Sequence, residues 1–366
     1  MTQPFPIVFA ADANFSVPLA IAVESLLASA RPETRYTIHV MDDGVLELVK
    51  RRLKEQCKLF DSEIAFHPVD ELVQDMPSTT YFHRVTFARF LIARLLRKYA
   101  YARVFYSDAD VLFCDDLSDM FDMDMQGHAL AGVQALAGLY ERFNHGDPYL
   151  PKWAANFSID LAERDGAYFN AGNFLLDCNL FEERGYAERA MEMSLRLTKD
   201  TAPYLDQDVL NAVCWRDIAL LPLKYCVIPI NEEYYACRDY EAMYRGHCLY
   251  SRDELRSALT SPAVVHFAGE KPRVLEGPRH VHEDRFIAFW ETSAWRDYMP
   301  YSPRIGSMSP SRFLKTNIPI SAQLGVLLKQ IFLYRVGSLV ASGSARTRYL
   351  EQYRGLRRVL QNARRR

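Results

Sequence analysis

The sequence has little net charge and no long hydrophobic run. Its formal net charge is -2 at pH 7, and charged residues make up 25% of the 366 residues. Proteins that bind nucleic acid through bulk electrostatics carry a strong basic excess, so we expect no nucleic-acid partner. Because no stretch of about 18 uninterrupted apolar residues occurs, we also expect no membrane-spanning helix.

The chain also lacks the cysteine patterns of zinc sites and of secreted disulfide scaffolds. Its seven cysteines form no C-x-x-C pair and are odd in number. This usage favours reduced thiols in a reducing compartment and argues against zinc. Residues 1–6 lead into a strand pattern without the basic and apolar regions of a secretory signal. We therefore expect a cytoplasmic protein.

The first part of the chain alternates between strand and helix patterns. Short apolar runs bounded by turn residues predict strands at 6–11, 36–41 and 63–68. Apolar residues at helical spacing predict helices at about 17–30 and 46–60. This βαβαβ order predicts a Rossmann-like α/β fold, in which ligands bind at the carboxyl edge of the sheet.

The dinucleotide fingerprint G-x-G-x-x-G does not follow the first strand. The turn there contains Asp12 and Asn14 instead, whose side chains could hydrogen-bond a base or a ribose. Capping of the next helix is the simpler interpretation for this pair alone. Both interpretations stay open at this point.

Two aspartates follow a strongly apolar run. Residues 104–113 read VFYSDADVLF, so we expect Asp108 and Asp110 at the carboxyl end of a buried strand. Side chains at i and i+2 of a strand lie roughly 6.6 Å apart on one side, which allows a single hard cation to bind between them. A solvated acidic turn is the alternative for these two residues alone.

Two later segments carry further polar groups. A helix predicted at about 85–98 contains Arg89, which could reach an anionic or hydroxyl-rich ligand, although arginines on helices are usually solvated. Residues 126–168 are rich in glycine and aromatic residues, which suits an excursion over the carboxyl edge with an acceptor site. In the next turn and strand, Gly172 permits close approach of the backbone to a ligand.

The helix predicted to open at 204–211 has Asp206 and Asp208 in its first turn. Stabilisation of the helix dipole explains these acids but not the intervening Gln207. Further on, a short buried strand ends at His266. A lone histidine is usually a packed side chain, but Gly269 and Lys271 add the backbone approach and the cation that a diphosphate needs.

Taken together, these motifs resemble the family 8 glycosyltransferases, a retaining GT-A group that includes lipopolysaccharide galactosyl- and glucosyltransferases and glycogenin. The resemblance spans about residues 6–275. It rests on six motifs in the family's order: Val8-Phe9-Ala10-Ala11-Asp12, Phe87-Ala88-Arg89, Asp108-Ala109-Asp110, Phe169-Asn170-Ala171-Gly172, Asp206-Gln207-Asp208 and His266-Phe267-x-Gly269.

The resemblance implies a GT-A fold, with a Rossmann-like mixed sheet flanked by helices. It places the nucleotide-sugar-binding catalytic domain at 1–275, including the excursion at 126–168 on the acceptor side. The remaining residues, 276–366, form a helical C-terminal region with a basic tail.

The resemblance also implies roles for individual residues. The uridine of a UDP-sugar would contact Ala10, Asp12 and Asn14. The metal Mn²⁺, with Mg²⁺ as the alternative ion, would bind Asp108, Asp110 and His266. The diphosphate would contact Gly269 and Lys271. The catalytic residues around the sugar would be Arg89, Asn170, Asp206 and Gln207.

One departure from the family's pattern concerns the diphosphate. The family usually has two residues between that glycine and the lysine, and a tryptophan after the proline. Here only Glu270 intervenes, and Arg273 follows Pro272. The assignment of Lys271 is therefore less well supported than the assignment of the metal ligands.

The implied activity is metal-dependent, retaining transfer of a hexose, galactose or glucose, from a UDP-sugar to a saccharide acceptor. Lipopolysaccharide core or another lipid-linked glycan is the expected acceptor. Two alternatives stay open. A phosphohydrolase of the haloacid dehalogenase type shares the apolar strand followed by Asp-x-Asp, and a non-catalytic scaffold would bind the nucleotide sugar without turnover.

The end of the chain is strongly basic. Apolar residues recur at helical spacing from Ile320 to Leu339, and residues 346–366 contain eight arginines against one acid, Glu351. Basic amphipathic helices bind anionic membrane surfaces, so we expect peripheral attachment to the cytoplasmic face of the inner membrane. A solvated or disordered tail is the alternative.

Overall fold

The structure is a computed structural model of the chain. It describes residues 4–76, 84–164, 167–197, 202–228, 243–268 and 282–296. The chain divides into a compact unit at 1–272 and 277–301 and a second unit at 273–276 and 302–366. The second unit, with the predicted basic tail, lies outside the described residues.

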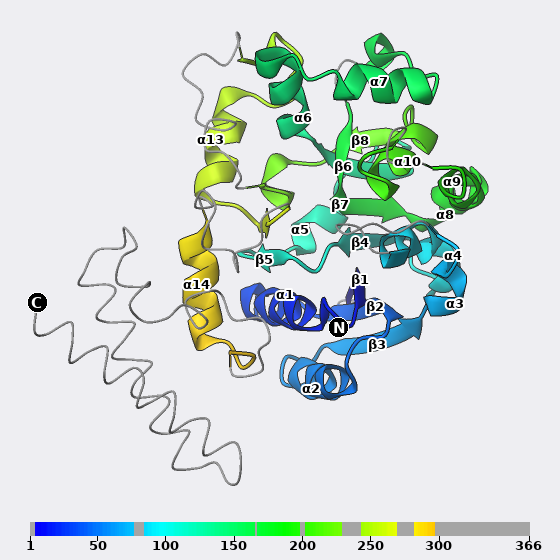
Figure 1. Cartoon of the computed structure of the whole chain (residues 1–366). Helices are drawn as coiled ribbons and strands as arrows, with labels where there is room; N and C mark the ends of the chain where they lie inside the picture. Colours follow the sequence, from blue (N-terminus) through cyan, green and yellow to red (C-terminus); the bar gives the residue numbers. More distant parts are fainter. Residues whose placement is uncertain are drawn as a thin grey trace, which may run out of the picture. The chain divides into compact units, whose positions relative to one another are not determined.

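A seven-stranded mixed sheet forms the centre of the first unit (Figure 1). Its strands are β1 Phe5–Asp12, β2 Tyr36–Asp43, β3 Glu63–Pro68, β4 Arg103–Ser107, β6 Leu130–Gln134, β7 Phe169–Asp177 and β8 Ile218–Leu220. Their order is β3-β2-β1-β4-β7-β6-β8. β1 to β4 run parallel, β7 runs antiparallel to β4 and β6, and β8 runs parallel to β6. The predicted Rossmann-like mixed sheet is confirmed.

Helices cover both faces of this sheet. The α-helices are α1 Ser16–Ser29, α2 Glu47–Lys58, α3 Asp70–Val73, α4 Ile92–Leu95, α5 Ser118–Phe121, α6 Leu136–Tyr140, α7 Tyr149–Asn156, α8 Cys178–Glu183, α9 Tyr186–Ser194, α10 Asp206–Val213, α13 Arg252–Thr260 and α14 Glu283–Thr292. The 3₁₀ helices are η1 Arg84–Leu91, η2 Arg97–Tyr99, η4 Leu161–Arg164 and η5 Leu223–Tyr225, and η3 Glu141–His145 is a π-helix.

Alternation along β1 shows how the two layers of core form. Ile7 and Phe9 pack into one cluster together with side chains of α1 and α2, whereas Val8 packs into a second cluster with η1, α4 and α9. Both clusters are apolar because a central parallel strand is buried on both faces. The centre of the sheet is therefore enclosed, whereas the outer strand β3 is only partly buried.

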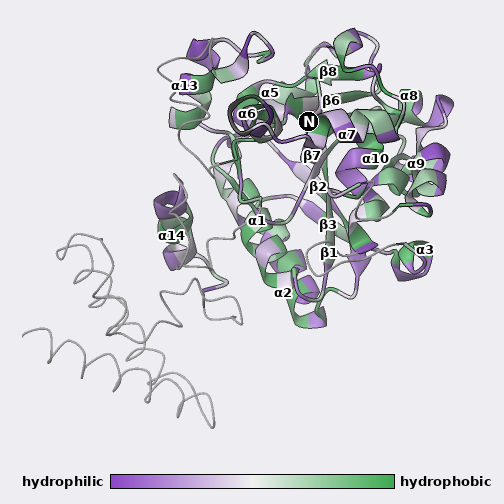
Figure 2. Cartoon of the chain, turned by 45° about the horizontal axis from the view of Figure 1, so that its top comes forward, coloured by the Kyte–Doolittle hydropathy of each residue, from purple (hydrophilic) through white to green (hydrophobic). Residues whose placement is uncertain are grey.

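The two helices predicted in the first part of the chain are present as α1 and α2, and they differ in how much of their surface is buried. Along α2, Val49, Leu53 and Cys57 are buried at a spacing of four residues, and the remaining positions are polar or exposed. Figure 2 shows the corresponding mixture of hydrophobic and hydrophilic residues along α2. In contrast, α1 is buried over most of its length.

Two segments differ from the sequence-based predictions. The helix predicted at 85–98 is divided into η1, α4 and η2, because almost every side chain of η1 is buried and no solvated face exists. Residues 130–134, predicted to belong to an excursion, form the inner strand β6. That the other residues of 126–168 serve an acceptor stays a prediction.

A small two-stranded sheet extends from the end of β4. β5 Val111–Phe113 pairs antiparallel with β9 Val264–His266. The short strand predicted to end at His266 is thus confirmed as β9. Its partner, β5, is the segment directly after the two aspartates. This pairing joins residues that are far apart in the sequence.

The residues that follow α14 pack against the first two helices. The backbone N–H of Ala294 donates to Glu24 Oε1 at 2.9 Å, and Trp295 Nε1 donates to Gln56 Oε1 at 3.2 Å. Trp290 is also buried. The domain boundary predicted at residue 275 stays a prediction, but the segment 282–296 beyond it belongs to the compact unit.

Two predictions from composition concern cysteine and the membrane. Each cysteine within the described residues is a free thiol. Among the helices that the structure describes, each is too short or too polar to cross a bilayer.

The packing of Trp295, which follows α14, predicts a measurable loss of stability. Trp295→Ala removes an indole that is 2% exposed and should lower the free energy of unfolding by about 3–5 kcal/mol in urea titrations. Leu59→Ala is the control, because Leu59 is 83% exposed and should change it by less than about 0.5 kcal/mol. Equal unfolding midpoints for the two variants would contradict the packing.

Candidate functional site

Three side chains of metal-binding type converge at the carboxyl end of β4. Asp108 and Asp110 lie in the bend between β4 and β5, and His266 ends β9, opposite Val111. His266 Nε2 lies 3.6 Å from Asp108 Oδ2 and 3.5 Å from Asp110 Oδ1. One ligand atom from each side chain lies within 4.8 Å of the other two. The structure thus brings together the three predicted metal ligands.

Backbone contacts hold this cluster in place. The N–H of Asp108 donates to Gly172 O at 2.7 Å, and the N–H of Phe267 donates to Asp110 O at 2.9 Å. A Cβ atom at position 172 would lie 2.2 Å from His266 Cε1 and 2.8 Å from Asp108 Oδ2. Gly172 is therefore required because β7 passes against the cluster. The close approach at this glycine is to protein side chains, and approach of its backbone to a ligand stays a prediction.

The chemistry of the cluster fits a divalent cation. Two carboxylates and an imidazole are ligands that suit Mn²⁺, whereas the sulfur ligands typical of structural zinc sites do not take part. Cys226 Sγ lies 3.8 Å from His266 Nδ1, on the other side of the ring. The Nε2 atom of His266 is thus the one that faces both carboxylates.

Arg89 is buried beside the cluster, and the expectation of a solvated arginine is wrong. Its side chain is 3% exposed, because the 3₁₀ helix η1 is buried on nearly all sides. One Nη atom donates to Asp108 Oδ1 at 2.9 Å, and the other lies 3.0 Å from Asp206 Oδ2. The Nη atom that faces Asp206 also donates to Ala171 O at 2.5 Å, and the guanidinium lies over the ring of Tyr106. Arg89 thus connects a metal-type ligand to the start of α10.

Asp206 and Gln207, at the start of α10, lie near the first residues of β7. Burial raises the pKa of Asp206, and the neighbouring Arg89 acts in the opposite direction. Gln207 Oε1 accepts from the N–H of Ala171 at 3.1 Å. Asn170 Oδ1 accepts from the N–H of Gly172 at 2.9 Å. Arg89, Asn170 and Gln207 therefore contact the backbone of the first residues of β7, and Asp206 is held beside them through Arg89.

Asp208 faces away from Arg89 and into a group of tyrosines. Its carboxylate is fully buried and accepts hydrogen bonds from the hydroxyls of Tyr149 and Tyr168 and from the N–H of Tyr204. Burial raises the pKa of Asp208 to about 6, although these hydrogen bonds lower it. The prediction of a helix-dipole role does not account for these contacts.

The residues predicted to contact uridine lie at the same sheet edge. Phe9 of β1 pairs with Ser107 of β4, so Ala10 and Asp12 reach the edge where Asp108 begins the bend. Asp12 Oδ1 accepts from the N–H of Phe15 at 2.9 Å, just before α1. Phe15 is the residue before α1, and α1 itself has no side-chain cap, so the capping interpretation is not confirmed and contact with a base stays a prediction. Asn14 is exposed.

Two predicted residues lie outside the described part of the chain. Gly269 and Lys271 follow Phe267 within the segment 269–281, which the structure does not describe. Their assignment to a diphosphate therefore stays a prediction.

Sequence reasoning missed several contacts of this site. Tyr106 donates to Asp108 Oδ1 at 2.8 Å from the interior of β4, and Tyr149 and Tyr168 reach Asp208 from distant segments. Nothing in an apolar strand pattern distinguishes a tyrosine that donates to a ligand from one that only packs. The aromatic enrichment of 126–168 was the one available signal, and it did not name a partner.

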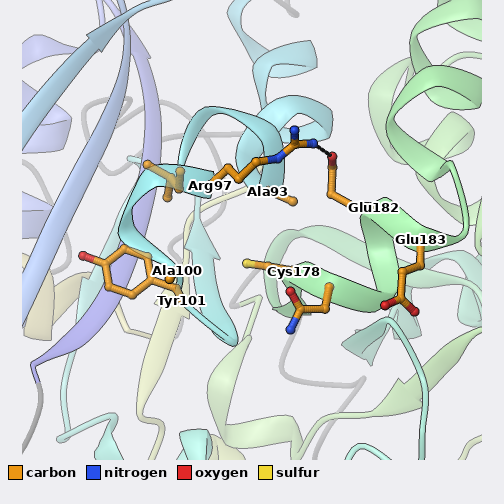
Figure 3. Close-up of a pocket in the computed structure, with 9 residues that line it drawn as sticks. Ala93, Arg97, Ala100, Tyr101, Cys178, Glu182 and Glu183 are labelled. Carbon is orange, nitrogen blue, oxygen red and sulfur yellow. Dashed lines mark hydrogen bonds and ion pairs between the residues drawn. The ribbon is translucent and has the colours of Figure 1, made fainter.

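A separate pocket lies at the opposite end of β4. It has a volume of about 290 Å³ and is lined by Ala93, Leu96, Arg97, Ala100, Tyr101, Cys178, Asn179, Glu182 and Glu183. Figure 3 shows the ion pair between Arg97 and Glu182 across it. Because Tyr101 precedes β4 and Cys178 follows β7, this pocket is at the amino end of β4, away from Asp108. It contains none of the predicted site residues.

Comparison with known proteins identifies relatives over most of the chain. A model described as glycosyl transferase family 8 matches residues 6–272. General stress protein A of Bacillus subtilis is 23% identical over 291 residues, 79% of this chain and 94% of the relative. Lipopolysaccharide 1,3-galactosyltransferase of Salmonella typhimurium is 28% identical over 215 residues, 57% of this chain and 58% of that enzyme.

Solved structures share the fold. The galactosyltransferase LgtC, in complex with donor and acceptor sugar analogs, is 23% identical with a TM-score of 0.59. The match covers 81% of this chain and 100% of LgtC. A bifunctional glycosyltransferase, WbbM, has a TM-score of 0.65 at 20% identity, covering 81% of this chain and 51% of its own.

These matches speak against one of the two alternatives left open by the sequence, the phosphohydrolase. The family model covers the whole sheet, the bend with the two aspartates and the strand that ends at His266. The Asp-x-Asp segment follows three parallel strands instead of opening the domain, which speaks against a haloacid dehalogenase. The chain has a GT-A fold and belongs to glycosyl transferase family 8.

Proposed function

We propose that the protein transfers a hexose, galactose or glucose, from a UDP-sugar to a saccharide acceptor, and that Mn²⁺ or Mg²⁺ is required. The observation that carries the proposal is the cluster of Asp108, Asp110 and His266 at the carboxyl edge of a family 8 chain. The relatives named as lipopolysaccharide galactosyl- and glucosyltransferases support a hexose donor and a lipopolysaccharide core or lipid-linked acceptor.

The leaving group in this reaction is a nucleoside diphosphate. A divalent ion, when bound, acts as a Lewis acid that stabilises the negative charge developing on the diphosphate. Asp108, Asp110 and His266 would hold that ion, and Gly269 with Lys271 would contact the phosphates. At the other end of the donor, Ala10, Asp12 and Asn14 would bind the uridine. Among the described residues, Ala10 and Asp12 lie at the end of β1, and the three proposed metal ligands lie after β4 and at the end of β9.

The hexose would lie against the first residues of β7. Arg89 and Asp206 form a buried ion pair there, with 3.0 Å between the charged atoms, and both present polar groups to sugar hydroxyls. Gln207 and Asn170 are fixed by hydrogen bonds to the backbone of β7. The positions of these groups are thus set before a donor binds, which is the condition for effective orientation.

The same contacts bear on how the anomeric configuration is retained. Retention through a covalent intermediate needs a nucleophile against the β face of the sugar. Asp206 is engaged by Arg89, Asp208 accepts three hydrogen bonds, and the amide of Gln207 is a poor nucleophile. We therefore favour displacement on the same face, assisted by the leaving phosphate.

The metal assignment predicts the behaviour of one conservative variant. Asp110→Asn keeps the size of a proposed ligand but removes its charge, and should lower the rate of UDP release by at least about 100-fold. The assay measures UDP released from a panel of UDP-hexoses with Mn²⁺, so that no acceptor needs to be known.

A matched control separates this effect from a general loss of charge. Asp119→Asn alters an exposed aspartate that pairs with Arg31, and should keep the wild-type rate. Full activity of the wild-type chain in EDTA would remove the metal from the proposal. Absence of UDP release from every UDP-hexose, with metal present, would refute the donor class.

Same-face displacement predicts that no glycosyl-enzyme accumulates. Intact-protein mass spectrometry of the chain incubated with its donor should show only the unmodified mass. Peptide mapping that located a hexosyl group on Asp206, Gln207 or Asp208 would establish the covalent route instead.

We also propose that the basic tail attaches the protein to the cytoplasmic face of a membrane. In flotation with phosphatidylglycerol-containing vesicles, the full chain should float, and a chain stopped before Ser321 should remain in the dense fraction. The expected difference should fall as salt is raised, because the attraction is electrostatic. Equal flotation of the two proteins at low salt would contradict the role of the tail.

A further inference from the structure

Asp208 is the point at which three segments of the site meet. Its Oδ1 atom accepts from the hydroxyl of Tyr168 at 2.6 Å and from that of Tyr149, and Oδ2 accepts from the N–H of Tyr204 at 2.8 Å. Its backbone oxygen accepts from Trp153 Nε1 at 3.2 Å. Tyr149 and Trp153 belong to α7, and Tyr168 immediately precedes β7. A single buried residue of α10 therefore binds both neighbouring segments.

The hydrogen bonds of Gln207 fix the orientation of its amide. Since Oε1 accepts from the N–H of Ala171 at 3.1 Å, the other atom is Nε2, which donates to the hydroxyl of Tyr168 at 3.1 Å. A phenol has one hydrogen, and that of Tyr168 goes to Asp208. Donation therefore runs in one direction, from Gln207 through Tyr168 to the carboxylate of Asp208.

This direction leaves Gln207 able to donate one more hydrogen bond. An amide nitrogen carries two hydrogens, so one N–H remains after the bond to Tyr168. If Tyr168 donated to Gln207 instead, the amide would have to rotate, and its oxygen would lose the N–H of Ala171. The carboxylate of Asp208 prevents this because it accepts the hydrogens of both tyrosines.

The backbone is bent where these residues begin. Leu205 has φ of +41°, in the left-handed region that side chains other than glycine rarely adopt. Directly after it, Asp206 faces Arg89 and Asp208 faces the tyrosines. Strain of this kind is kept where the surrounding contacts require it.

We propose that Tyr149, Tyr168 and Asp208 form a brace that holds the carboxamide of Gln207 with one N–H toward the donor hexose and couples α7 to the donor site. The inference rests on the proposed function, because the hexose is assigned to this edge there. All three are positioning residues: Tyr168 acts on Gln207 directly, and Asp208 acts through Tyr168. Tyr149 acts through Asp208 and through its own hydroxyl, which lies 2.7 Å from that of Tyr168.

The brace depends on the ionised form of Asp208. Its pKa is about 6, and the groups that face it are Tyr149 from α7, Tyr168 before β7, and Tyr204 and Asp206 from α10 and the turn before it. Burial raises the pKa of each of the three tyrosines, so these remain protonated near neutral pH. Protonation of Asp208 removes an acceptor, and the rate of hexose transfer should therefore decline as the pH falls through about 6.

The test compares two variants that each remove one hydroxyl from the same carboxylate. Tyr168→Phe also breaks the bond to Gln207 and should lower kcat for UDP release between about 10- and 100-fold, with little change in the KM for the donor. Tyr149→Phe keeps that bond, so its kcat should fall less. Because both variants remove a donor that lowers the pKa of Asp208, the acid limb of their pH profiles should move to higher pH.

Tyr101→Phe is the control for losing the hydroxyl of a half-buried tyrosine. Tyr101 bonds to His39 Nε2 at 3.0 Å, at the opposite end of β4, and its variant should keep the wild-type kcat and pH profile. Circular dichroism and thermal unfolding confirm that each variant is folded. Wild-type kcat and an unchanged acid limb in folded Tyr168→Phe would overturn the brace.

A second measurement does not depend on activity. With ¹⁵N-labelled glutamine, the side-chain amide signals of Gln207 are identified by their absence in Gln207→Glu. They should shift with a midpoint near pH 6 in the wild-type chain and in Tyr101→Phe, and should not show this shift in Tyr168→Phe or Asp208→Asn.

The two measurements separate the inference from the function on which it rests. A Gln207 signal that is insensitive to pH between 5 and 7 would refute the brace even if hexose transfer is demonstrated. If no UDP-hexose is turned over, the proposed function fails, while the presence or absence of the shift still decides whether the brace exists.

Discussion

The site depends on the buried guanidinium of Arg89. Carboxylates from the bend after β4 and from the start of α10 approach one another at a single sheet edge, in surroundings that exclude much of the solvent. A buried charge without a partner is costly, and removal of one member of a buried ion pair typically destabilises a protein by about 3–5 kcal/mol. Arg89 contacts Asp108 and Asp206 together, so it allows both elements to approach. The first residues of β7 can then lie between the bend after β4 and the start of α10.

The site also requires a residue without a side chain at position 172. β7 runs antiparallel to β4, which brings the backbone at Gly172 against the cluster formed by the two aspartates and His266. A side chain there would occupy the space of the imidazole. The order of the strands thus has a chemical consequence, since a parallel strand in this place would present a different part of its backbone to Asp108.

The sequence predicts the parts of this fold whose pattern is local. β1 and α1 are continuously apolar segments bounded by turn residues, and α2 has a buried residue at every fourth position. Asp108 with Asp110 stands out because acids rarely follow so apolar a run. Arg89 was misjudged because helical spacing carries no information on whether a helix is enclosed by other elements. The contacts of Asp208 with Tyr149 and Tyr168 were not predictable, because the hydroxyls come from segments separated by 59 and 40 residues. Similarly, β6 was hidden because its partner strand β7 comes later in the chain.

The third metal-type ligand, His266, belongs to the small sheet of β5 and β9. Each of its strands has three residues, whereas β1 has eight. The segment is nevertheless held on both sides, because the N–H of His266 donates to Val227 O at 2.8 Å and the N–H of Val227 donates to Val264 O at 2.9 Å. A ligand bound by all three side chains would raise the free energy of any local opening of this segment, because the opened segment could no longer bind it.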